Sequence, residues 1–372
     1  MEGESISEWK EVRLGDVSTI NAGGDAPRGN MSKVKNEKFF IPIYSNGIDN
    51  QGLYGFTNKA IIERPACTIT ARGTIGVVFN RKEPYYPIVR LISVIADESI
   101  IKNDFLYYLL RNTRIKGDGS VQEQFTVPMA KDIHLKIPTS IENQDHITGI
   151  LSSLDAKIET NNKLNEKLEE MAQAIFKSWL DGCDETVQID DLSLNITDYS
   201  KLNKDKVILI NSSDVTNGFF DHHNYSDNNK LKGHFKKRFS KGDILYSQVR
   251  PRNRHWAYCY FDAEDYIAST QLMVIRNNPE KVSSLLLYQY LISDRVWNEF
   301  TLKTETRSGT FPQGNYEDLS KICVPYKKDN EKISKTLEHI YNIIYNRYDE
   351  NQRLASLRDT LLPRLMSGEI KI

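Results

Sequence analysis

The chain has 372 residues, of which 39 % are hydrophobic and 27 % are charged, and this composition excludes disordered, collagen-like and disulfide-scaffold proteins. At roughly 150 residues per domain, the length predicts two or three domains. Lysine and arginine number 49 against 50 aspartates and glutamates, so the net charge is −1. An attraction to nucleic acid would therefore have to come from a local concentration of basic residues.

The beginning of the chain and its cysteines favour a cytoplasmic protein. Residues 1–5 are acidic, and no apolar run approaches the roughly 20 residues that span a bilayer, so neither a signal peptide nor a membrane anchor is expected. Cysteines that lie far apart fit reduced thiols better than a zinc site or a disulfide framework. They are Cys67, Cys183, Cys259 and Cys323.

The first part of the chain predicts a strand-rich mixed α/β domain. Short β-rich runs at residues 39–44, 67–70 and 88–95 alternate with turns that contain Gly, Asn or Asp. A helix is expected at 103–111, where Tyr107 and Tyr108 are interpreted as packing residues.

A cationic loop precedes these strands, and it contains Arg28, Lys33, Lys35 and Lys38 among Gly and Asn residues. Such a loop suits phosphate contact. It is equally consistent with an ordinary surface loop.

A long helix is predicted from about 143 to 180, roughly 55 Å at 1.5 Å per residue. Its apolar residues recur at spacings of four and three, the a/d pattern of a coiled-coil seam. The predicted seam residues are Ile147, Leu151, Leu154, Ile158, Asn165, Leu168 and Ile175.

The second half of the chain repeats these features in the same order, which indicates an internal repeat. Residues 12–17 resemble 187–192 at an offset of 175, and a helix expected at about 284–296, with Tyr288 and Tyr290, corresponds to 103–111. Later matches have an offset near 186. They are Phe125 with Phe311, Asp132-Ile133 with Asp318-Leu319, and Ile137-Pro138 with Val324-Pro325.

A second long helix carries the same seam 186 residues further on. Asn165 and Asn351 fall at matching a positions, where a polar residue costs stability but fixes register and partner. Two such helices most simply pack antiparallel, with the mixed α/β domains at opposite ends of a rod and a pseudo-two-fold axis between them. The alternative is that both are core helices of ordinary domains. The second seam consists of Ile333, Leu337, Ile340, Ile344, Asn351, Leu354 and Leu361.

Residues 230–254 form a basic stretch with nine lysines and arginines and one acid, Asp243. This local charge of +8 predicts a directed electrostatic surface. Lysines in a loop neutralise phosphates, while arginine and asparagine pair with guanine and adenine edges. A solvated, charged hairpin is the alternative interpretation.

Pro251 is expected to fix a turn from which Arg250, Arg252 and Arg254 project. A similar strand followed by Arg72-Gly73-Thr74 stands where the repeat predicts one. The candidate DNA-binding residues are Arg28, Lys33, Lys35, Arg72, Thr74, Lys236, Lys237, Arg238, Arg250, Arg252, Asn253 and Arg254.

Catalytic and metal-binding signatures are not found in the sequence. There is no phosphate-binding loop, no His-Glu-x-x-His and no Asn/Asp-Pro-Pro-aromatic tetrad. His222-His223 has no third ligand close in sequence, which favours exposed loop histidines. We expect no catalytic residue, metal or cofactor in this chain, because its sequence lacks every motif that a self-contained nuclease or methyltransferase would need.

Six segments together carry a resemblance to a known family. They are WKEVRLGDV (9–17), IYSNGI (43–48), residues 144–158 ending in LDAKI, AIFKSW (174–179), GDILYSQVRP (242–251) and LLPRLMSGEI (361–370). Over essentially its whole length, the chain resembles the DNA-specificity subunit of type I restriction–modification enzymes. The second half departs from the pattern because it lacks a tryptophan equivalent to Trp9.

This resemblance implies two target-recognition domains, at 1–142 and 184–328, each reading one half of a bipartite site in double-stranded DNA. A central helix (143–183) and a C-terminal helix (329–372) would act as spacer and as docking surface. Two methyltransferase (M) subunits, which would bind S-adenosylmethionine, and restriction/translocase (R) subunits are the implied partners. The competing hypothesis is a coiled-coil assembly adaptor whose globular halves do not bind DNA.

Overall fold

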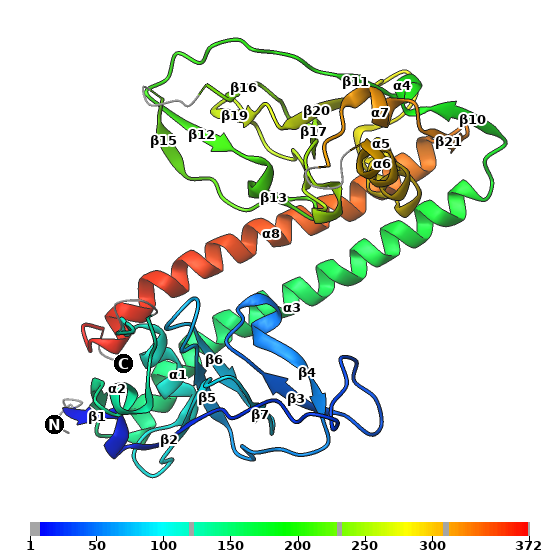
Figure 1. The fold of residues 1–372 in the computed structure, drawn as a ribbon. Helices are drawn as coiled ribbons and strands as arrows, with labels where there is room; N and C mark the ends of the chain where they lie inside the picture. Colours follow the sequence, from blue (N-terminus) through cyan, green and yellow to red (C-terminus); the bar gives the residue numbers. More distant parts are fainter. Residues whose placement is uncertain (1–7, 119–122, 229–232, 308–311, 371–372) are drawn as a thin grey trace. The chain divides into compact units, whose positions relative to one another are not determined.

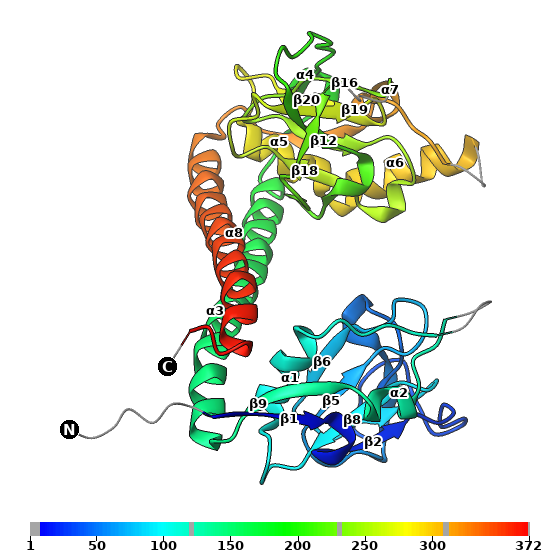
Figure 2. The same cartoon turned by 90° about the vertical axis from the view of Figure 1, so that its left-hand side faces the viewer.

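The computed structural model describes residues 8–118, 123–228, 233–307 and 312–370, and its residues cluster into two compact units (Figures 1 and 2). Unit 1 consists of Met1–Thr160 and Asn351–Ile372, and unit 2 of Asn161–Glu350. Each unit therefore combines one of the expected mixed α/β domains with part of each long helix.

Unit 1 contains three groups of strands and two short helices. A four-stranded antiparallel sheet has the order β2-β8-β5-β6, a second sheet has the order β4-β3-β7, and β1 pairs with β9. Helix α1 packs against the four-stranded sheet. The bounds are β1 Trp9–Arg13, β2 Ser18–Ala22, β3 Ile41–Tyr44, β4 Leu53–Thr57, β5 Ala66–Ile69, β6 Val78–Arg81, β7 Tyr86–Pro87, β8 Ile92–Ala96, α1 Asn103–Arg111, α2 Val127–Lys131 and β9 His134–Pro138.

Unit 2 has the same plan with additions. Its main sheet has the order β11-β20-β17-β18, a second sheet runs β15-β12-β19-β16, β10 pairs with β21, and β13 pairs with β14. The strands are β10 Glu185–Gln188, β11 Ser193–Asn195, β12 Lys206–Ile210, β13 Val215–Thr216, β14 Phe219–Phe220, β15 Tyr225–Asp227, β16 Phe235–Lys237, β17 Ile244–Ser247, β18 Trp256–Tyr258, β19 Tyr266–Ser269, β20 Leu272–Asn277 and β21 Cys323–Tyr326. The shorter helices are α4 Ile189–Leu192, α5 Ser284–Ile292, α6 Asp294–Arg307 and α7 Tyr316–Ser320.

The shared topology confirms the internal repeat. The four-stranded sheets of the two units have equivalent strands in the same order, and each second sheet contains one parallel pair, β3 with β7 and β12 with β19. The strand pair that opens each repeat also matches: Val12 lies opposite Leu135, and Val187 opposite Val324.

These strand pairs correct the later sequence matches. They place the equivalent residues 175 apart in the first strand but 189 apart in the second, not near 186. Asp132 ends α2, whereas Asp318 lies in the first turn of α7 and caps it, so the two aspartates are not equivalent. Phe311 lies outside the described residues.

Two expected elements differ from the structure by more than two residues. The helix expected at 284–296 is split, because Ser293 is extended between α5 and α6 (φ −60°, ψ 144°). The strand expected at 88–95 begins only at Ile92, because Val89 and Arg90 have left-handed backbones with φ of 54° and 63°.

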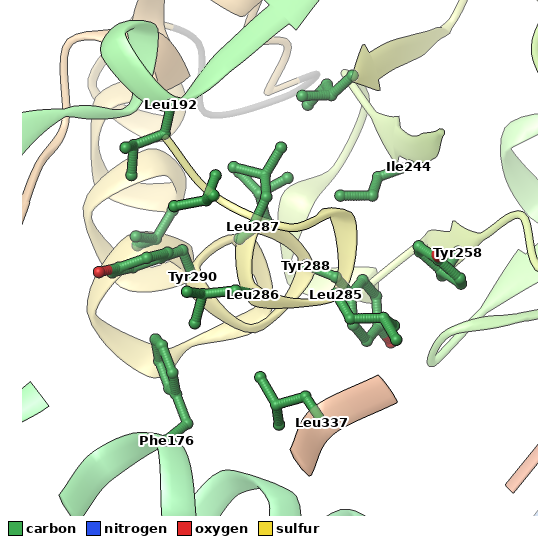
Figure 3. Close-up of a cluster of buried hydrophobic side chains, with 14 of the residues drawn as sticks. Phe176, Leu192, Ile244, Tyr258, Leu285, Leu286, Leu287, Tyr288, Tyr290 and Leu337 are labelled. Atoms are coloured by element: carbon green, nitrogen blue, oxygen red, sulfur yellow. The ribbon is translucent and has the colours of Figure 1, made fainter. Parts of the chain in front are cut away.

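Each hydrophobic core includes residues from both long helices, α3 Ile141–Leu180 and α8 Glu331–Met366. In unit 1, Leu151 and Leu365 are buried with the side chains of α1. In unit 2, Phe176 of α3 and Leu337 of α8 pack on α5, as Figure 3 shows. Of the expected packing tyrosines, Tyr108, Tyr288 and Tyr290 are buried, and Tyr107 is half-buried against the core of unit 1.

The long helices pair antiparallel, as predicted. In unit 2, the Nδ2 of Asn161 donates to Glu350, that of Asn165 to the carbonyl of Ile344, and Tyr341 donates to Glu169, so one number rises as the other falls. None of the predicted seam residues is exposed.

The burial pattern nevertheless changes which residues of α3 and α8 are equivalent in the repeat. Asn161 and Asn351 are the asparagines buried in the seams, at 1 % and 8 % exposure, and Asn165 is only half-buried. This equivalence has an offset of 190, the same as that between the first residues of α3 and α8. A seam with spacings of three and four overlaps itself after a shift of four, so periodicity alone selected the wrong asparagine.

Candidate nucleic-acid interface

Two equivalent hairpin loops carry the leading candidate residues. One joins β5 to β6 in unit 1 and the other joins β17 to β18 in unit 2, and both hairpins lie at the same place in the same sheet order. Arg72 and Arg250 each follow the last residue of the preceding strand by three positions. The similar loop that the repeat predicted is therefore present.

The loop of unit 2 has a defined backbone. Residues Pro251–Asn253 form a short 3₁₀ turn, and the residues on either side, Arg250 and Arg254, have φ of 48° and 52°. The amide of Asn253 donates to the carbonyl of Arg250 at 2.9 Å, and that of Arg254 to the carbonyl of Pro251 at 3.1 Å. Proline presets the first turn residue, as the sequence suggested.

Two arginines of this loop are paired with acids. Arg252 makes a two-pronged contact with Glu305, which through hydrogen bonding and charge raises the pKa of the guanidinium. Arg254 lies 3.3 Å from Asp294 and stacks over the ring of Trp297, with 4.2 Å from its guanidinium carbon to the ring centroid. All three partners belong to α6.

The other two candidates of this loop are Arg250 and Asn253, and both are exposed. The amide of Arg250 donates to the carbonyl of Pro312 at 2.9 Å. Arg250 and Asn253 line a surface pocket of about 470 Å³ together with Arg252 and Glu305. The side chains on this surface have the donor groups that base edges and phosphates require.

The candidates on β16 and just after it do not share one surface. Lys236 is exposed, but Lys237 is only 6 % exposed and its ammonium donates to the carbonyl of Leu272 at 2.6 Å. Burial lowers the pKa of Lys237. Arg238 is half-buried and donates to the carbonyl of Glu264 at 2.8 Å. Neighbouring residues of a strand point to opposite faces, so consecutive basic residues cannot all reach DNA, and Lys237 is not available to it.

Lys230 and Lys232 of the predicted basic stretch lie outside the described residues.

The corresponding loop of unit 1 relies on glycines. Gly73 and Gly76 have φ of 70° and 88°, and Gly76 stands where unit 2 has Arg254. Arg72 is half-buried and donates to the side chain of Gln124 at 3.3 Å, while Thr74 is exposed.

The cationic loop before β3 is exposed in most places. Arg28 lies in a turn, and Lys35 is exposed. The ammonium of Lys33 donates to the carbonyl of Tyr54 at 2.9 Å and lies over the ring of the same residue, 3.5 Å from its centroid.

Sequence reasoning missed a bridge beside the unit 1 loop. The side chain of Asn46 donates to the carbonyl of Val89 and accepts from the amide of Ala71, both at 2.6 Å. It thereby joins the Arg72 loop to the left-handed corner that contains the exposed Arg90. A left-handed backbone is a genuine outlier for a β-branched residue such as Val89. The segment IYSNGI around Asn46 gives no local pattern that predicts this bridge.

Metal sites and membrane spans each require a characteristic arrangement of residues, and the described residues contain neither arrangement. In the part of the chain that is described, no three His, Cys, Asp or Glu residues could together hold an ion, and no helix is long and apolar enough to cross a membrane. His222 and His223 are half-buried and not exposed, contrary to expectation: His222 lies 3.4 Å from Asp214, and His223 contacts the hydroxyl of Tyr266 at 2.6 Å. Burial lowers the pKa of His223.

The long helices also expose apolar side chains. Exposed fractions of 38–47 % are high for such residues and mark candidate contact surfaces for other proteins. They are Ile150, Leu164 and Met171 on α3 and Leu357 on α8.

Comparisons with known proteins agree with this architecture. The model of the type I restriction modification DNA specificity domain matches twice, at residues 6–170 and 185–355. The HindI specificity subunit of Haemophilus influenzae is 34 % identical over 176 residues, which are 46 % of this chain and 38 % of that subunit. The MjaIX specificity subunit of Methanocaldococcus jannaschii is 20 % identical over 98 % of this chain and 97 % of its own.

A crystal structure with the same fold is the S subunit of a type I restriction-modification system from M. genitalium, with a TM-score of 0.65 and 13 % identity over 98 % of both chains. The chain spans less than half the length of the first curated relatives it matches. The family model, in contrast, matches most of the chain in two copies, one for each repeat. The chain therefore belongs to the family of type I restriction modification DNA specificity proteins.

Proposed function

We propose that this chain is the DNA-recognition subunit of a type I restriction–modification enzyme and that its two units each read one half of a bipartite site in double-stranded DNA. The observation that carries the proposal is the equivalence of the Arg72 and Arg250 loops, which lie on the same hairpin of the same sheet in both units. Two units with the same fold and equivalent loops suit a target that consists of two half-sites.

The side chains of each loop suit distinct parts of the task. Arginine pairs bidentately with guanine, and asparagine with adenine, so Arg72, Arg250 and Asn253 are the proposed base readers. Exposed lysines such as Lys35 and Lys236 contact phosphates, which fixes position without reading sequence.

We further propose that the chain has no catalytic role of its own and holds the catalytic subunits. Two methyltransferase subunits, with S-adenosylmethionine bound to them, dock on the exposed apolar side chains of α3 and α8, and restriction/translocase subunits join that core. Apolar side chains such as Met171, 46 % exposed, and Leu357, 47 % exposed, support this docking.

The test is selection of DNA by the complete assembly. The chain is purified with its methyltransferase, and bound duplexes are recovered from a random pool at moderate salt. Enrichment of two short half-sites at a fixed separation is the expected result. Binding that weakens steeply with salt is also expected, because several cationic contacts release counterions.

A stable complex without sequence enrichment, and with little dependence on salt, would instead support the adaptor. In that case the globular halves do not bind DNA, and the arginine loops are ordinary surface.

A further inference from the structure

The second reading loop lies against a helix that has no counterpart among the described residues of unit 1. Helix α6 (Asp294–Arg307) stands between α5 and α7. The corresponding segment of unit 1, between α1 and α2, contains no helix in its described residues, 112–118 and 123–126. The loop of unit 2 therefore has a helical support that the described part of unit 1 does not provide for its own loop.

One face of α6 is fixed in the core. Val296 and Phe300 are both fully buried, and Phe300 makes an edge-on contact with Tyr246 of β17, with 5.7 Å between ring centroids. The helix packs on β17 through this ring contact, and the loop is the chain segment that directly follows β17. The position of α6 thus determines where its other side chains meet the loop.

Another face of α6 contacts the loop along its length. Asp294, Trp297 and Glu305 are separated by three and eight residues, spacings that place side chains on one side of a helix. The indole N–H of Trp297 donates to the carbonyl of Pro251 at 2.9 Å. Its ring stacks under Arg254, Asp294 pairs with the same arginine, and Glu305 pairs with Arg252.

The loop backbone needs such support. Arg250 and Arg254 are left-handed, a conformation that costs energy for residues other than glycine and persists where surrounding contacts fix it. At the position of Arg254, unit 1 has Gly76, which adopts a positive φ without this cost.

We propose that α6 positions the second DNA-reading loop, with Trp297 fixing the backbone at Pro251 and the acids of α6 fixing the directions of Arg252 and Arg254. This inference rests on the proposed function and names positioning residues for one of its two reading surfaces. Preordering a loop in its binding conformation lowers the entropic cost of recognition. Variants on α6 should therefore affect one half-site and not the other.

The test uses Trp297→Phe, which removes the N–H donor and retains an aromatic ring. The complex with the methyltransferase is used to select DNA from the random pool. Preference for the correct base in the half-site read by unit 2 is expected to fall about five- to tenfold, the value of one hydrogen bond. The other half-site stays unchanged. Leu302→Ala, on an exposed position of the same helix, is the matched control and leaves both half-sites unchanged.

A second measurement follows the loop without DNA. Trypsin cuts after arginine only where the side chain and backbone can leave the folded surface, so cleavage after Arg252 and Arg254 reports how firmly the loop is fixed. Trp297→Phe and Glu305→Gln are both expected to speed cleavage there severalfold, identified by mass spectrometry, while Leu302→Ala does not.

The outcomes separate the two proposals. If wild type selects two half-sites but Trp297→Phe changes neither selection nor cleavage, α6 does not position the loop. If Trp297→Phe weakens binding to all sequences equally, α6 contributes stability alone and the inference is also wrong. If wild type selects no half-sites, the proposed function fails, whatever the cleavage rates.

Discussion

Arginine occupies the same position in two loops with different surroundings. Arg72 lies among glycines and donates to Gln124, whereas Arg250 lies next to Pro251 in a left-handed conformation. Both have the rigid fork of donors that suits bidentate contact with a base edge. The residue type is the same while its backbone differs, so the two loops present one chemical group from different backbone conformations.

Replacing either arginine tests this assignment directly. Arg250→Ala is expected to relax one half-site and Arg72→Ala the other, each by about 1–3 kcal/mol if the contact is bidentate. Binding of duplexes with each base of each half-site changed in turn provides the measurement. Each variant is the control for the other, because each leaves one loop intact.

Equal weakening on all sequences would contradict the base-reading role. It would mean that the arginine in question contacts phosphate. The slope of log affinity against log salt concentration would then fall by about one. Lys236→Ala, an exposed lysine of unit 2, should show that phosphate behaviour.

The sequence predicted where basic residues concentrate but not which way their side chains point. The run Lys236-Lys237-Arg238 read as one basic patch, yet Lys237 faces inward and donates to Leu272. A strand only three residues long has too little alternation to reveal its buried face. Asn46 was missed for a similar reason, because its partners Ala71 and Val89 are distant in sequence.

At the scale of elements, periodic features were the most predictable. The first long helix was expected at 143–180 and spans Ile141–Leu180, and the helix at Asn103–Arg111 was expected with the same bounds. Helix α6 was not expected beyond Val296, because its inward positions are few and polar residues cover the rest. The local pattern also could not decide whether Asn161 or Asn165 is the residue of α3 that is equivalent to Asn351, since both fit a seam with spacings of three and four.

The helix pair of unit 2 contains an acid in an unfavourable environment. Burial raises the pKa of Glu169, although Tyr341 donates to it at 2.7 Å. A carboxyl group whose pKa is raised on folding stabilises the protein below its ordinary value of 4.5, and this stability is lost as the pH rises through the raised value. At neutral pH, ionised Glu169 therefore lowers the free energy of unfolding of unit 2.

Glu169→Gln should remove that cost, since an amide oxygen accepts the same hydrogen bond without ionising. The free energy of unfolding of the variant, relative to wild type, is expected to increase from pH 4 to pH 8. Urea unfolding of the full chain across this range measures it, with Glu166→Gln at an exposed position of α3 as the control. Parallel pH curves for wild type and Glu169→Gln would show that the carboxyl group is not the source.

At the scale of the whole molecule, the chain passes between its units twice, once within α3 at Thr160–Asn161 and once within α8 at Glu350–Asn351. Both crossings lie inside continuous helices, and each core includes residues from both. A unit cannot be separated from the helices without losing part of its own core. The helices are therefore structural parts of each unit as well as the connection between the units.

If the helices set the separation of the half-sites, their length should set the spacer. Four residues inserted after Asn162, with four inserted at the matching place near Asn351, would lengthen the pair by about 6 Å. At about 3.4 Å per base pair, the selected spacer should grow by about two base pairs, with both half-sites unchanged. Selection from a random pool by the complex with methyltransferase measures spacer and half-sites together.

The matched insertion matters because contacts across the pair fix its register. An insertion in α3 alone would leave α8 too short to keep both the Asp155–Arg358 pair on one side of it and the Asn165–Ile344 pair on the other, so the single insertion should lose stability and selection together. An unchanged spacer with the double insertion would show that helix length does not determine it. Altered half-site bases would contradict the proposal more deeply, because reading would then depend on the helices and not on the loops of each unit.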